Sequence, residues 1–229
     1  MASKAEIDDW DFEEVRPNQI PKLSDQILDR CAESMFDDEV KKFLPAGCIE
    51  ELVSLEAIIK EVKKKDHLQP GDLDLPEGSG KKKLVEFVRG KANKVFAITV
   101  ISGIDGGDLG KAMLQFMEIG FTDESLPLTE EHSKRIVFFR DMAFPWSKTR
   151  IFKFCREQWI FLAPVFSQQN FMVTLRPEHI LPFIKKSEVV KEGAFGQVYM
   201  VDIHPAHQED PILNVRRFLP FTITHLDGH

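Results

Sequence analysis

The sequence predicts a mainly α-helical N-terminal region followed by a short β fragment. Apolar residues recur at helical spacing between Ser24 and Pro164. From Ile184 onward, apolar and polar residues alternate in two short runs, 188–191 and 197–203, with glycines between them. These periods are typical of amphipathic helices and of strands, respectively. We therefore expect a flexible acidic arm over residues 1–22, a helical domain over 23–180 and the β fragment over 181–229.

The composition limits the classes of protein to consider. The chain has 229 residues, of which 43% are hydrophobic, enough for one or two globular domains. With 37 acidic against 30 basic residues the formal net charge is -7, so we expect neither a nucleic acid nor a membrane as partner. Cys31, Cys48 and Cys155 are far apart, and the sequence shows no secretory signal and no membrane span. These features predict an intracellular protein, cytoplasmic or nuclear.

Two helices are expected in the first third of the chain. The first begins near Ser24, a plausible N-cap, and the second ends in the cations of "KEVKKK", which suit the negative end of the helix dipole. Residues 66–80 are rich in Pro, Gly and Asp and predict an exposed connection. The apolar positions that define the two helices are Ile27, Leu28, Cys31 and Met35, then Ile49, Leu52, Leu55, Ile58, Ile59 and Val62.

The apolar run from Val95 to Ile101 fits either a buried helix or a buried strand, since periodicity alone does not separate the two. We favour a helix, because Lys91–Lys94 lead into the run without a turn signal. A further helical pattern, from Leu109 to Met117, follows after "GIDGGD". The last helix is expected from about Ser147 until Pro164 stops it, and "FMVTL" after it is strand-like.

The most informative stretch is "VVKEGAFGQVYMV", residues 189–201. Two glycines three residues apart flank an alanine and a phenylalanine, and β-type residues stand on both sides. The glycine-rich loop of protein kinases is G-x-G-x-x-G-x-V between two antiparallel strands, with an aromatic tip over the ATP phosphates. The stretch resembles that loop, with Gly193 in the second glycine slot, Phe195 at the tip after Ala194, Gly196 in the third slot and Val198 in the valine slot.

The resemblance to the protein kinase family covers roughly residues 184–214, the start of the N-lobe. Helical segments followed by this loop and by "IHPAHQEDP" also resemble the front of fungal protein-kinase-domain proteins with a helical N-terminal extension. The resemblance implies ATP as cofactor, with Mg expected for the complete family, and protein phosphorylation as the family-level function. It assigns nucleotide contacts to Lys191, Gly193, Ala194, Phe195, Gly196 and Val198.

Two departures from the family pattern bear on activity. Lys191 occupies the first glycine slot, and no lysine follows it to serve as the third-strand lysine that contacts the phosphates. The sequence contains neither an H-R-D catalytic loop nor a D-F-G metal-binding segment. We therefore expect a truncated kinase-like chain that is catalytically inactive. The alternative is a non-enzymatic helical module that binds a protein partner through the region from Ser24 to Pro164, and a plain β-hairpin would explain the glycines without any nucleotide.

Other candidate sites are weaker. His204 and His207, with Asp202, Glu209 and Asp210 nearby, allow a metal site to be imagined, but an H-x-x-H pair without cysteines is more often a polar turn. Cys155 with His132 or His179 could be a nucleophile and base, yet no catalytic motif surrounds them. The lysine triplets 63–65 and 81–83 are most simply solvated helix ends, with a small nucleic-acid or phospholipid contact as the alternative. We predict no metal ligand and no catalytic residue.

Overall fold

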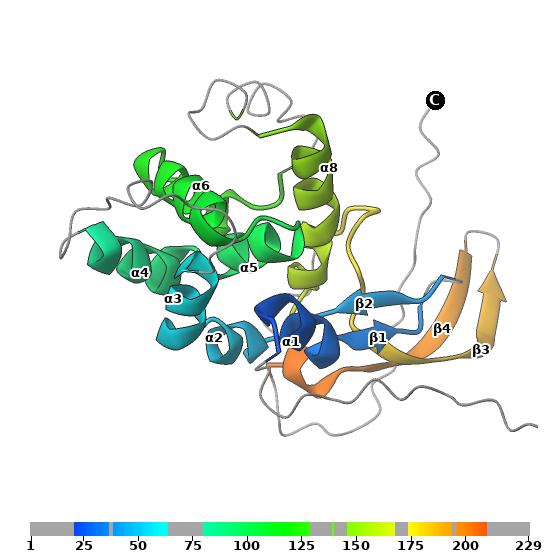
Figure 1. The fold of residues 1–229 in the computed structure, drawn as a ribbon. Coiled ribbons are helices and arrows are strands. Elements are labelled where there is room, and N and C mark those ends of the chain that lie inside the picture. The colour runs from blue at the N-terminus through cyan, green and yellow to red at the C-terminus, as the bar shows by residue number, and fades with distance from the viewer. Residues whose placement is uncertain are drawn as a thin grey trace, which may run out of the picture.

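The structure is a computed structural model that describes residues 21–36, 39–63, 80–128, 139, 146–167, 174–193 and 196–209 of the chain. Helices make up one body, and a β-hairpin lies at its side with a smaller hairpin between them (Figure 1). The coarse prediction of a helical region followed by a β fragment is thus confirmed. The helices are α1 (Leu23–Arg30), α2 (Cys48–Leu52), α3 (Leu55–Lys63), α4 (Gly80–Lys91), α5 (Asn93–Ile101), α6 (Gly106–Glu118) and α8 (Lys148–Glu157), with 3-10 turns η1 (Asp123–Ser125), η3 (Gln158–Phe161) and η4 (Pro205–His207).

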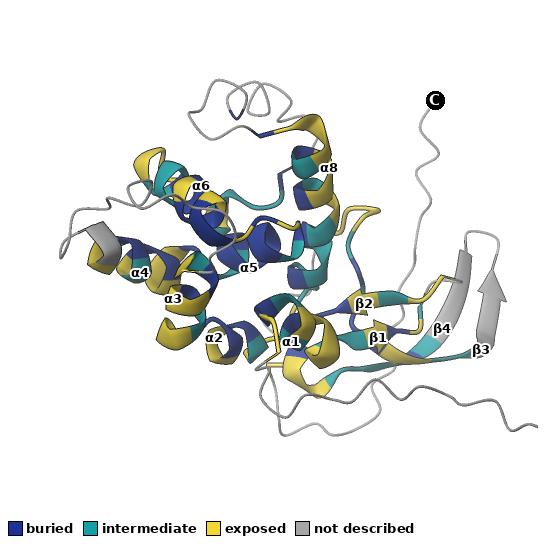
Figure 2. Ribbon diagram, viewed as in Figure 1, coloured by how far each residue is buried: buried dark blue, intermediate teal, exposed yellow. Residues whose placement is uncertain are grey.

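Helix α5 is the centre of the core. The apolar run that fitted either a helix or a strand is helical, and every residue from Val95 to Val100 is buried. Helix α5 contacts α1, α2, α4, α6 and α8, which surround it (Figure 2). A helix that is apolar on all sides is stable only when neighbours cover it all round, which is the arrangement found here.

Backbone groups at both ends of α5 form hydrogen bonds with residues outside the helix. Local sequence rules identify only some of these residues. The backbone N–H groups of Lys94 and Val95 donate to the Asp123 carboxylate over 3.1 and 2.9 Å, so a distant side chain caps the N-terminus. At the C-terminus, Gly103 adopts φ 83°, its N–H donates to Val100 O, and the N–H of Ile104 donates to Thr99 O. This is a Schellman ending, which explains why "GIDGGD" separates α5 from α6.

The two helices expected at the N-terminus are shorter than predicted. Helix α1 ends at Arg30, its N-cap is Lys22 rather than Ser24, and Ala32–Ser34 form strand β1, which pairs antiparallel with β2 (Lys41–Phe43). The second predicted helix breaks at Val53 into α2 and α3, and the Ser54 hydroxyl accepts the N–H of Ala57 at the start of α3. The helical pattern missed these breaks because tertiary pairing and a local cap override the periodicity.

The β fragment is an antiparallel hairpin of β3 (Phe183–Gly193) and β4 (Gly196–Ile203). Its base lies against the β1–β2 hairpin. The N–H of Met35 donates to Phe183 O over 2.7 Å, and the Lys186 ammonium donates to Phe36 O over 2.9 Å. Phe183 is 1% exposed, and its ring centroid lies 5.4 Å from that of Phe36 and 5.9 Å from that of Phe166. Packing therefore continues across the boundary expected near residue 180.

This continuity predicts that the hairpin base supports the helical region. Phe183→Ala should lower the free energy of unfolding by about 3 kcal/mol or more, because a fully buried ring leaves a cavity. The matched control is Ile184→Ala, next in sequence and 37% exposed, which should cost less than about 1 kcal/mol. Urea unfolding followed by the helical circular dichroism signal measures both. Equal stabilities of the two variants would show that the hairpin folds independently of the helices.

Candidate functional site

The glycine-rich stretch forms the tip of the β3–β4 hairpin. Gly193 and Gly196 are register partners at the end of the two strands. Ala194 and Phe195, the two residues between them in the sequence, lie outside the described residues. The next pair along the strands is Glu192 with Gln197, and the pair after that is Lys191 with Val198. The two antiparallel strands expected around the loop are therefore present, and their register brings Lys191, Gly193, Gly196 and Val198 together at one end of the hairpin.

The base of the hairpin is fixed by several specific contacts. The N–H of Met200 donates to the Ser187 hydroxyl over 2.9 Å, and Lys185 lies 3.8 Å from Asp202. Val201 is 4% exposed. The register shifts three times between Phe183 and Lys191, and such bulges bend a ribbon and increase its twist. The hairpin is thus anchored at its base, and the glycine end points away from the helices (Figure 1).

His207 joins the end of this hairpin to the helical region. The side chain is 2% exposed, and its Nε2 accepts the N–H of Ala46 over 3.1 Å. Because Nε2 accepts, the proton of the neutral ring sits on Nδ1, which lies 3.0 Å from Pro164 O and donates to it. The ring also meets Phe43 edge-on, with centroids 5.2 Å apart. Sequence reasoning placed His207 in a polar turn and missed this role, for which the sequence carries no signal.

The histidine nitrogens that a metal site at this place would use take part in hydrogen bonds instead. Both nitrogens of His207 are engaged with backbone groups, and His204 Nδ1 accepts the N–H of Ala206 over 3.2 Å. Asp202 pairs with Lys185, and Asp210 lies outside the described residues. Among the residues that the structure describes, no three His, Cys, Asp or Glu side chains are grouped to hold a metal ion. The arrangement serves packing and capping.

The Cys155 thiol and the lysine triplets also have structural roles. Cys155 packs against the core from α8, whereas His179 accepts the N–H of Arg176 over 2.8 Å and lies edge-on to Trp159. His132 lies outside the described residues. Of the lysine triplets, Lys82 on α4 lies 4.0 Å from Glu86, one turn along the helix. This pairing agrees with a solvated helix face.

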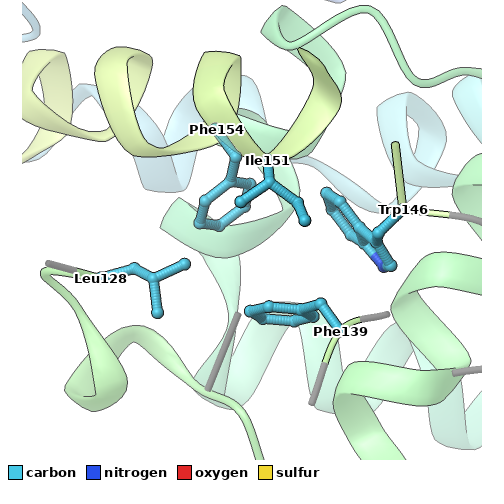
Figure 3. Close-up of a pocket in the computed structure, with 5 residues that line it drawn as sticks. All are labelled: Leu128, Phe139, Trp146, Ile151 and Phe154. Carbon is cyan, nitrogen blue, oxygen red and sulfur yellow. The ribbon is translucent and has the colours of Figure 1, made fainter. Parts of the chain in front are cut away.

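A pocket in the helical region is apolar throughout. Leu128, Phe139, Trp146, Ile151 and Phe154 line it, and their side chains point toward one another (Figure 3). The side chains leave no space between them that would admit even a water molecule. Sites for drug-sized ligands measure about 300–1,000 Å³ and carry a few placed polar groups. The pocket is a packing gap between aromatic rings, and it does not fit a nucleotide.

Comparisons with known proteins give the chain no relative. No protein-family model matches it, and neither a curated protein nor a solved structure does. Within the described ranges, every helix is too short or too polar to cross a membrane; α6, with 13 residues, is the longest of them.

The His207 contacts predict a stability that depends on pH. Burial lowers the pKa of His207 below its ordinary value of 6.5, the bond to Pro164 O opposes this, and His204 adds to it. The unfolded chain then takes up the proton first, so the free energy of unfolding is highest above the ordinary pKa and falls as the pH drops below it. One proton contributes a slope of at most about 1.4 kcal/mol per pH unit.

His207→Gln should flatten this pH dependence, because the side chain no longer titrates. His204 and His179 also have lowered pKa values, through burial, so the slope should be reduced and not abolished. Gln208→Ala is the control, since it removes the bond to Ile203 O without removing a titrating group. Urea unfolding at three pH values measures the slopes. An unchanged slope in His207→Gln would contradict the assignment of the proton uptake to this ring.

Proposed function

We propose that residues 191–198 are a nucleotide-phosphate loop of the protein-kinase type, carried on a helical scaffold, and that these 229 residues bind ATP weakly without transferring its phosphate. The observation that supports this is the hairpin register. It sets Gly193 opposite Gly196, and the two residues between them in the sequence include a phenylalanine. Glycines at the end of such a hairpin allow the backbone to approach phosphate oxygens closely, and its N–H groups are the donors.

The loop supplies only part of a nucleotide site. Lys191 stands in the first glycine slot, one register pair beyond Glu192 and Gln197. The chain offers no later lysine for the α and β phosphates and no D-F-G aspartate for Mg. Phosphoryl transfer depends on these parts acting together, so the loop alone provides contact without catalysis.

Backbone amide shifts during a titration with Mg-ATP test the proposal. We expect shifts centred on residues 191–198 and a dissociation constant no tighter than about 1 mM, since a single loop contacts the phosphates. Gly193→Val should abolish the shifts, because a branched side chain blocks close approach of the backbone. Gly90→Ala on α4 is the control, since an added methyl group there meets no atom within 4 Å.

Two results would contradict this function. Shifts spread over the helices and insensitive to Gly193→Val would place ATP elsewhere. Micromolar affinity, or phosphate transfer lost on changing Gly193, would mean that the chain completes a site of a kind its sequence does not predict. A titration without any shift favours the second candidate, a non-enzymatic module that binds a protein through its helices. The observation that favours this second candidate is the exposure of apolar side chains on the helices, at Leu28 of α1 and at Leu55 and Ile59 of α3.

A further inference from the structure

Helix α8 has one face in the core and one face in solvent. Ile151 and Phe154 are buried against the aromatic cluster around Phe116. The opposite face follows the spacing of a single helix stripe. It consists of Lys148, Thr149, Phe152, Lys153 and Arg156, all exposed, and we refer to these five residues as the α8 face.

Phe152 is the unusual member of this face. Its exposed fraction is 65%, the highest among the large apolar residues that the structure describes. A single exposed apolar side chain is ordinary on a protein surface and carries no argument alone. Here, however, cations flank it one turn before (Lys148), one residue after (Lys153) and one turn after (Arg156), so the face combines an aromatic anchor with a basic rim.

The charges of the α8 face are only partly neutralised. Lys148 and Lys153 have no ion-pair partner among the described residues, whereas Arg156 pairs with its neighbour Glu157. Arg150, at the side of the face, lies 3.4 Å from Asp108 of α6. The α8 face is basic and aromatic, although the chain as a whole has a net charge of -7. This local reversal of sign favours a short acidic segment as the occupant. A long polyanion is disfavoured, because the acidic remainder of the chain repels it.

The sequence contains a segment of complementary chemistry. Residues 8–14 read "DDWDFEE", five carboxylates around Trp10 and Phe12. Its aromatic rings match Phe152, and its carboxylates match the flanking cations. We propose that the α8 face is the docking surface for this segment of the same chain. The proposal does not depend on nucleotide binding by the hairpin.

The length of chain permits this contact. Glu14 lies seven positions before Pro21, where the described chain begins, and Asp8 lies thirteen positions before it. Extended chain spans at most about 3.4 Å per residue, which gives a reach of roughly 24 to 44 Å. Helix α1 packs on α5 and α5 on α8, and each helix spacing is about 8–10 Å. Covalent connection also raises the effective concentration of the segment, so that a weak contact is populated.

Zero-length cross-linking of the full chain with a carbodiimide tests the proposal. Amide links form only where a lysine ammonium and a carboxylate are in ion-pair contact. We expect links from carboxylates of residues 8–14 to Lys148 and Lys153 in the monomer, and far fewer to Lys83, an exposed lysine of α4. Raising the salt from about 0.05 to about 0.5 M should reduce them, because exposed charges are then screened.

Phe152→Ala should reduce these links by about tenfold while leaving every lysine in place, as expected for the loss of an aromatic anchor. Val40→Ala is the matched control, since Val40 is 64% exposed and lies outside α8. Both variants change exposed residues and should fold, which an unchanged thermal melting curve confirms.

Three outcomes would overturn the proposal. Links to Lys83 as abundant as those to Lys148 and Lys153 would mean random collision. Links confined to dimers would assign the face to a second copy. Sedimentation with anionic phosphatidylserine vesicles that depends on Phe152, without the intramolecular links, would assign the face to a membrane surface.

Discussion

The neutral ring of His207 is the constraint on which the arrangement of helices and hairpins depends. Its two nitrogens bind backbone groups of Ala46 and Pro164, 161 and 43 residues away in sequence. Around it, the N–H of Leu44 donates to Ile160 O, the N–H of Phe166 donates to His207 O, and the N–H of Glu209 donates to Phe166 O. Three connections between elements therefore meet at one buried imidazole. A buried polar group of this kind is stable only while each partner is present, so the three segments must fold together.

The same device, a distant polar side chain bound to backbone groups, recurs in the helical region. Asp123 caps α5, and the buried Glu61 accepts the N–H of Leu23 at the start of α1. Gln158 accepts from Leu128 N and donates to Leu128 O over 2.7 and 2.8 Å, which fixes that segment against η3. Helices of eight to thirteen residues are marginal alone. Long-range caps make their formation depend on the assembled core.

This dependence explains how much could be predicted from the sequence. The helix at Val95–Ile101, the start of α8 at Ser147 and the strands around Gly193 and Gly196 follow from local signals. These signals are a lead-in to the apolar run without a turn signal, an N-cap residue and the alternation of apolar and polar residues. The short strands β1 and β2 could not be predicted, because three residues carry no period and their pairing rests on the burial of Phe43 and on contact with Phe183. The candidate loop was found from its glycines, whereas the junction at His207 depends on residues that only the fold brings together.

The position of the glycines on the hairpin has a consequence for any ligand. The base is held by the buried side chains of Phe183 and Val201 and by the Lys186 bond to Phe36 O. A sheet of two strands is marginal by itself, and local stability falls with distance from buried contacts. We therefore expect the pairs at the glycine end to open more readily than those at the base. Phosphate contact at Gly193 and Gly196 would have to order this end of the hairpin, and that ordering cost subtracts directly from the affinity. A third strand beside β4 would remove the cost, since its backbone bonds would hold the glycine end in place whether or not a nucleotide is bound.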